Sequence, residues 1–179
     1  MARQTDGCAM LNAVKTQDVP VRVEPELRVF NLYLETLTMV ERLHRRLLDV
    51  IKDEFDRRGR SDVNAVQALL LYNIGDKELT AGELRTRGYY LGSNVSYNVK
   101  KLVEMGYLHH ARSRIDRRSV RISLTELGKE VHRIVGGIYE KHARTVEQIG
   151  GVPGDDLARV NVSLLRLERY WTDQIKYRL

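Results

Sequence analysis

The sequence has few of the features that mark secreted or membrane-spanning proteins. Its one cysteine, Cys8, cannot form an internal disulfide and is expected to be a mobile, reduced thiol. A redox-sensing role is the alternative, but no resolving cysteine or cationic cluster surrounds this thiol. No run of about 18 apolar residues exists, and residues 1–22 lack the charged and apolar regions of a signal peptide. These absences predict a cytoplasmic protein.

Motifs for catalysis and metal binding are also missing. The sequence contains no P-loop, no Gly-x-Ser-x-Gly element and no catalytic Cys/His pair, so neither an enzyme nor a bound cofactor is predicted. Among the five histidines, His109 and His110 are adjacent on an expected strand and therefore point to opposite faces. His132 and His142 lie too far apart along one helix to share an ion. No metal site is expected.

What is present is a globular composition with an uneven charge. The 179 residues are 42% apolar, which suits one core or two modest lobes, and the net charge is +6. The stretch from Arg85 to Arg121 contains nine basic residues and only two acidic ones, Glu104 and Asp116. That one stretch carries more than the whole excess of the chain, so a polyanionic partner is predicted to bind there.

Apolar periodicity begins after residues 1–22, which are expected to form a loose leader. Residues 26–57 predict one long helix whose apolar band is too wide for one-sided packing, so contacts on two sides are expected. One stripe contains Val29, Leu32, Val40, Leu43, Leu47 and Val50, and the stripe beside it contains Phe30, Leu34, Leu37, Ile51 and Phe55. A second helix is predicted to start at a cap on Ser61 or Asp62 and to stop at Gly75.

The next segment predicts helix, turn, helix and a two-stranded hairpin. Thr80 and Glu83 have the spacing of a capping box, which starts a short helix. Ser93 opens a further helix that ends at Gly106, with Val95, Val99, Leu102 and Val103 facing inward. Residues 107–111 and 120–124 then alternate with period two, which is typical of strands. The hairpin between them has a basic tip.

Two C-terminal helices are predicted after the hairpin. Thr125 caps the first, which extends to Gly150-Gly151, and the second follows Pro153-Gly154 and carries Leu157, Leu164 and Trp171. Gly136 and Gly137 interrupt the first of these helices at a cost of about 1 kcal/mol each relative to alanine. They predict either close packing of helices or a kink.

A helix-turn-helix followed by a basic hairpin is a known arrangement for reading duplex DNA. The major groove is about 12 Å wide and accepts one helix, whose exposed side chains then meet the base edges. Arginines of the hairpin suit phosphates or the narrow minor groove, because guanidinium is always charged and binds phosphate with two donors. The predicted DNA-binding residues are Ser93, Asn94, Ser96, Tyr97, Asn98, Lys100, Lys101, Arg112, Arg114, Arg117 and Arg118. Asn94 and Asn98 are the preferred base readers, and Arg114 and Arg117 the preferred hairpin contacts.

These residues resemble those of the MarR family of bacterial winged-helix regulators. The resemblance lies in Leu79-Thr80 with Glu83-Leu84, in Val95-Ser96 with Gly106-Tyr107-Leu108, and in Asp116-Arg117-Arg118-Ser119 followed by Leu124-Thr125-Glu126 and Gly128. Tyr97 and Asn98 stand where the family often has an arginine and an aliphatic residue, so the target sequence is expected to differ. Residues 88–94 resemble an alphaproteobacterial subgroup linked to cell-wall L,D-transpeptidase genes.

The resemblance implies a mainly α fold with a small β-wing, divided into four parts. These are a flexible leader (1–22), an N-terminal dimerisation helix (23–60), a winged helix-turn-helix DNA-binding domain (61–124) and C-terminal dimerisation helices (125–179). It further implies a homodimeric repressor on a near-palindromic operator of double-stranded DNA, located with the nucleoid when bound. A small aromatic or phenolic effector near His44 and Tyr72 is implied as well. The alternative function is a winged-helix module that binds another protein, with incidental DNA contact.

Overall fold

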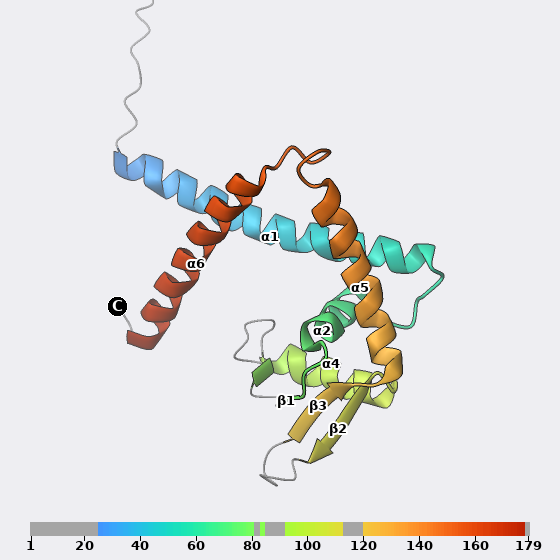
Figure 1. Cartoon of the computed structure of the whole chain (residues 1–179). Coiled ribbons are helices and arrows are strands. Elements are labelled where there is room, and N and C mark those ends of the chain that lie inside the picture. Colours follow the sequence, from blue (N-terminus) through green and yellow to red (C-terminus); the bar gives the residue numbers. More distant parts are fainter. Residues whose placement is uncertain (1–24, 81–82, 85–91, 113–119, 178–179) are drawn as a thin grey trace, which may run out of the picture. The chain divides into compact units, whose positions relative to one another are not determined.

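The computed structural model describes residues 25–80, 83–84, 92–112 and 120–177 (Figure 1). Its elements are α1 (Pro25–Arg57), α2 (Ala65–Ile74), β1 (Leu79–Thr80), α4 (Gly92–Glu104), β2 (Leu108–Arg112), β3 (Val120–Leu124), α5 (Glu126–Thr145) and α6 (Gly154–Tyr177). The predicted class, mainly α with a small β-wing, is confirmed. The chain divides into two compact units between Arg42 and Leu43, within α1. The predicted leader, residues 1–22, lies outside the described residues.

The start of α2 differs from the prediction. Its cap is Asn64 rather than Ser61 or Asp62. The Asn64 side chain accepts a hydrogen bond from the Gln67 backbone N–H (2.9 Å), and the Gln67 side chain accepts one from the Asn64 N–H (3.2 Å). This reciprocal pair satisfies two backbone donors that a helix start leaves free. The predicted end at Gly75 is confirmed, with its N–H bonded to the Leu71 carbonyl.

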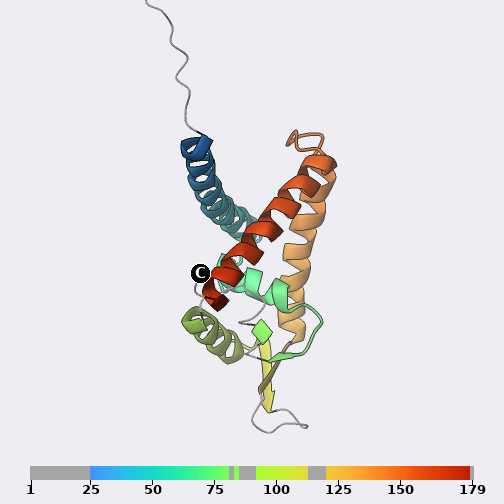
Figure 2. The ribbon, with the colours of Figure 1, turned by 90° about the vertical axis from the view of Figure 1, so that its left-hand side faces the viewer.

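The sheet has three antiparallel strands in the order β1-β3-β2, one more than predicted. The hairpin of β2 and β3 pairs Leu108 with Leu124 and Arg112 with Val120. The additional strand β1 has two residues and pairs Leu79 with Ile122. A strand this short shows no alternation, which is why the sequence pattern missed it. Figure 2 shows the hairpin strands extending away from the helices α2 and α4.

One hydrophobic core joins the helix-turn-helix to the helices around it. Its largest fully buried side chains are Ile51 of α1, Leu70, Leu71 and Ile74 of α2, Leu84, Leu102 of α4, Ile122 of β3, and Val131 and Val135 of α5. Ile51 and Phe55 come from the second apolar stripe of α1, so one of the two predicted contact sides of that helix is this core. The core therefore fixes α4 and the hairpin against α2 and α5.

The two adjacent glycines of α5 have different surroundings. A Cβ added to Gly136 would lie 3.7 Å from a ring carbon of Tyr72, which is an ordinary van der Waals distance, so alanine would also fit there. A Cβ added to Gly137 would meet nothing within 4 Å. Neither glycine is therefore required for close packing of helices in the described structure, and Gly137 faces open space.

Large apolar side chains remain exposed at both ends of the described chain. In α1 up to Arg42, Val29 is 67% exposed and Phe30 56%. In α6, none of the residues is buried, and Leu165 and Ile175 are 62% and 81% exposed. Burying such surface yields roughly 25 cal/mol for each Å². Faces of this size usually mark an interaction surface. No helix among the described residues is long and apolar enough to cross a membrane.

Candidate nucleic-acid interface

The helix α4 has an inner and an outer face. Val99 and Leu102 are buried in the core at 8% and 0% exposure, as predicted. On the outer face Ser96, Tyr97, Lys100 and Lys101 are exposed, and Asn98 is half-buried. Tyr97 is 63% exposed, which is unusual for a large aromatic side chain without an outside partner. The helix thus offers hydroxyl, amide and ammonium groups to a ligand surface.

The two lysines of this face are only loosely neutralised. Glu104 lies 3.9 Å from the Lys100 Nζ and 3.8 Å from the Lys101 Nζ. Side chains this exposed gain little from such pairs, because water screens the attraction. Both ammonium groups can therefore turn toward phosphates without a large loss. Ser93 and Asn94 lie in the first turn of α4, but their side chains are outside the described part of the chain.

The C-terminal end of α4 is fixed by backbone bonds to neighbouring elements. Gly106 adopts a φ of +80°, which glycine tolerates best, and the Tyr107 N–H bonds to the Leu102 carbonyl at 2.8 Å. The Thr125 hydroxyl donates to the Gly106 carbonyl (2.7 Å) and accepts from the Gly128 N–H (3.1 Å). The predicted cap of α5 at Thr125 is therefore confirmed, and the same side chain ties α5 to the exit of α4.

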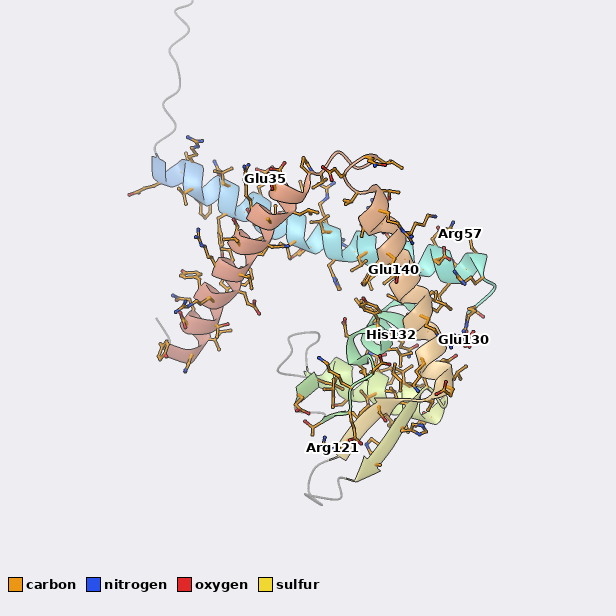
Figure 3. All side chains as sticks on the ribbon, viewed as in Figure 1. Glu35, Arg57, Arg121, Glu130, His132 and Glu140 are labelled. Atoms are coloured by element: carbon orange, nitrogen blue, oxygen red, sulfur yellow. The ribbon has the colours of Figure 1, made fainter. Side chains whose placement is uncertain are left out.

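A polar cluster holds the same exit to the loop between α1 and α2. The Tyr107 hydroxyl donates to Asp62, and Arg60 donates to both the Tyr107 oxygen (3.1 Å) and Asp62 (3.0 Å). Arg60 also pairs with Glu130 of α5 at 3.1 Å; Figure 3 labels Glu130. Arg60 lowers the pKa of Asp62 to about 2, with help from Tyr107. Burial and Asp62 raise the pKa of Tyr107. Side chains from the α1–α2 loop, the turn before β2 and α5 thus hold the exit of α4 in place.

Acid should weaken this cluster. Because the pKa of Asp62 is lowered from 3.8 to about 2, the charged form stabilises the fold fully above about pH 4. That contribution is lost as the pH falls from about 4 to about 2. We expect the melting temperature of the Asp62→Asn variant to change less than that of the wild type across this window. Thermal melts followed by circular dichroism check this. Parallel pH curves for the two proteins would show that Asp62 contributes nothing.

The hairpin is described only in its strands. Arg112 ends β2, and its side chain is not described. Arg114, Arg117 and Arg118 lie outside the described residues. Arg121 in β3 lies 3.7 Å from Glu78, so this member of the basic stretch is partly neutralised by the segment before β1. Figure 3 labels Arg121 on the hairpin.

The residues predicted to contact an effector lie in α1 and α2. His44 is exposed on α1. The Tyr72 ring stacks on His132 of α5, with ring centres 4.9 Å apart, and meets the edge of Tyr139 at 4.8 Å. His132 Nδ1 also lies 3.1 Å from the Tyr72 carbonyl oxygen. Tyr72 is thus part of an aromatic cluster that joins α2 to α5.

Comparison with known proteins agrees with this architecture. The winged helix DNA-binding domain family matches residues 63–128. The exopolysaccharide II synthesis transcriptional activator ExpG of Rhizobium meliloti (strain 1021) is 32% identical over 176 residues, covering 96% of this chain and 90% of that protein. The chain belongs to the MarR family of winged-helix transcriptional regulators. Proteins of this family are regulators and not enzymes.

Solved structures of MarR-family proteins share this fold. The transcriptional regulator SlyA superposes with a TM-score of 0.66 at 16% identity, covering 80% of this chain and 99% of that one. FabT of Streptococcus pneumoniae in complex with DNA gives 0.59 at 21% identity, covering 79% and 98%. An E. coli MarR variant complexed with operator DNA gives 0.61 at 16% identity, covering 77% and 96%. In two of these structures, the winged helix is seen with its DNA.

Sequence reasoning missed the cluster of Arg60, Asp62, Tyr107 and Glu130. Its members come from three segments that are far apart in the sequence, and Tyr107 follows Asp62 by 45 positions. Nothing in the local pattern marks them, since each polar residue alone is typical of a loop or an exposed helix face. The one available signal was Tyr107 itself, a tyrosine at an apolar position of the expected strand, whose buried hydroxyl needs a partner.

Proposed function

We propose that this MarR-family regulator is a homodimer that binds sequence-specifically to double-stranded DNA. The supporting observation is the outer face of α4, the proposed recognition helix, where Tyr97, Lys100 and Lys101 are exposed and the C-terminal end is held by hydrogen bonds. Because such a helix is already ordered, it can enter the major groove without a further loss of conformational entropy. Base contacts are assigned to Asn94 and Asn98, and phosphate contacts to the two lysines and to Ser93, Ser96 and Arg112. Arg114, Arg117 and Arg118 complete the proposed interface on the hairpin.

The dimer is proposed from the exposed apolar faces of α1 and α6. On α1 the first stripe includes Val29, Val40 and Leu43, which are 67%, 40% and 67% exposed. On α6 Leu157, Leu164 and Trp171 recur at spacings of seven and are 38–40% exposed. A second copy would bury both stripes and place two recognition helices about one DNA turn apart, or 34 Å. The parts 23–60 and 125–179 are accordingly assigned to dimerisation, and 61–124 to DNA.

A salt titration tests the phosphate contacts. The logarithm of DNA affinity falls with the logarithm of salt by about 0.9 for each phosphate neutralised. Lys100→Ala is therefore expected to lower this slope by about one per recognition helix engaged, as measured by fluorescence anisotropy on duplex DNA. Lys52→Ala removes another exposed lysine, which lies on α1, and should leave the slope unchanged. If both variants keep the wild-type slope, Lys100 does not reach phosphate.

The sign of regulation depends on where the operator lies. The resemblance to MarR regulators favours a repressor, whereas the rhizobial relative is named an activator. An operator that overlaps the promoter supports repression, because bound protein excludes the polymerase. An operator upstream of the promoter supports activation.

An aromatic effector is proposed at the cluster around Tyr72. His132 and Tyr139 already hold one aromatic ring there, and an aromatic acid would add a further ring of similar polarity. Titration with salicylate in a calorimeter is expected to release or absorb heat, and Tyr72→Ala should remove the signal. No heat at high protein concentration would contradict the effector proposal and leave the DNA proposal standing.

A further inference from the structure

We infer that a cavity between α1 and α5 binds a small phosphomonoester. The cavity has a volume of about 330 Å³ and is separate from the Tyr72 cluster. From α1 it is lined by Val50, Glu54 and Arg57, from the turn after α1 by Arg58, and from α5 by Gly137, Ile138, Lys141 and His142. All of these residues belong to the unit after Leu43. Its size lies at the lower end of the range for small-molecule pockets.

The lining is chemically divided into a cationic and an apolar part. Arg57, Arg58 and Lys141 bring three positive charges against one negative charge, that of Glu54. Lys141 makes no ion pair among the described residues, and it is exposed. Val50 and Ile138 supply apolar surface beside the charges. Asp53 lies outside the lining but pairs with Arg57, so the local excess is one positive charge, carried by Lys141, which suits the anionic group of a phosphomonoester.

Glu54 holds the two arginines in place. It accepts from Arg58 at 2.8 Å and from Arg57 at 3.1 Å, and its side chain is only 22% exposed. Asp53, which is not part of the lining, also pairs with Arg57 at 2.9 Å. Guanidinium groups oriented in this way retain further N–H donors, and these can bind the oxygens of a phosphate group.

Gly137 is the second observation that supports a ligand in this cavity. A glycine inside a helix destabilises it relative to alanine, and it is usually explained by a close contact. Here an added Cβ would meet nothing within 4 Å, so no packing contact requires this glycine. What its missing side chain leaves is space on the α5 wall of the cavity. The position therefore keeps room for a ligand at the expense of helix stability. Figure 3 labels Arg57 on α1 and, on α5, Glu140, which lies beside Lys141 in the sequence.

Calorimetric titration of the full chain with phenyl phosphate tests the site. We expect binding with a dissociation constant below about 1 mM, weakened at least about tenfold in Lys141→Ala and in Gly137→Leu. The leucine fills the cavity without removing any of its charges, and the alanine removes a charge without filling the cavity. Arg144→Ala, which removes another exposed cation of α5 outside the cavity, should bind like the wild type. Melting curves confirm that each variant is folded.

Several results would overturn the inference. These are no heat with the wild type, or equal binding in the wild type, Lys141→Ala and Gly137→Leu. Inorganic phosphate binding as tightly as phenyl phosphate would show an adventitious ion only. Benzoate binding as tightly would show a carboxylate site instead. The titration contains no DNA, so its failure would leave the proposed operator binding untouched.

Discussion

Replacing Leu43 with glutamate is expected to separate the dimer into monomers and to weaken operator binding by about 100-fold or more. Leu43 is 67% exposed at the middle of the apolar stripe of α1, where a partner helix would cover it. A carboxylate buried there without a partner would lose its hydration. A monomer then holds one half-site alone and loses the gain in effective concentration that a linked second half-site provides.

Two measurements check this result. Sedimentation equilibrium should give the mass of one chain for Leu43→Glu and of two chains for the wild type. Fluorescence anisotropy on an operator duplex selected from genomic DNA should show the loss of affinity. Leu43→Met is the matched control, because it keeps an apolar side chain of similar size and should remain dimeric. A Leu43→Glu protein that stays dimeric would place the interface elsewhere. A monomer that binds the operator as tightly as the wild type would separate dimerisation from DNA binding.

Gly128→Ala is expected to reduce the free energy of unfolding by about 2–3 kcal/mol. A Cβ at Gly128 would lie 2.3 Å from the Tyr107 carbonyl oxygen and 3.2 Å from a methyl group of Leu124. The carbonyl cannot simply withdraw, because it accepts the Thr125 N–H at 3.1 Å. Relief of the clash therefore requires α5 to move away from the exit of α4. For a chain of this size the melting temperature should fall by roughly 5–10 °C.

Gly137→Ala is the control for this substitution. The same change is made in the same helix, but the new methyl group meets nothing, so stability should rise by up to about 1 kcal/mol. Urea unfolding curves of the two variants and the wild type give the comparison. If Gly128→Ala melts with the wild type, then α5 tolerates a shift at its first turn, and the described approach to Tyr107 is not a constraint.

Much of the fold was predictable because it depends on local patterns. The long period-3.6 stripe of α1 and the period-two alternation of β3 each recur over several turns or residue pairs, and both elements appear at the expected positions. The caps at Thr80 and Thr125 were predictable for the same reason, since each hydroxyl bonds a backbone N–H three residues later. On α4 the helical spacing of the apolar residues predicted that Val99 and Leu102 face inward. The opposite face was then expected to be exposed, and it carries Ser96, Tyr97, Lys100 and Lys101.

The parts that were missed depend on residues far apart in the sequence. The strand β1 forms because Leu79 pairs with Ile122 of β3. A segment of two residues has no periodic pattern from which this pairing could be predicted. Asp62 was predicted as a possible helix cap, but its carboxylate binds Arg60 and Tyr107. Asn64 caps α2 instead, because the side chains of Asn64 and Gln67 each accept a hydrogen bond from the other residue's backbone N–H. The cavity beside Gly137 could not be predicted either, because the sequence does not show that the arginines at the C-terminal end of α1 line the same cavity as this glycine.

The central claim is that the chain binds a defined operator as a dimer, and selection from genomic DNA tests it most directly. Purified protein is incubated with sheared DNA from its own source, and the bound fragments are recovered and sequenced. We predict enrichment of a near-palindrome whose half-sites are about one turn, or 10 base pairs, apart. Uniform recovery across the genome would contradict the claim and favour a winged-helix module that binds another protein.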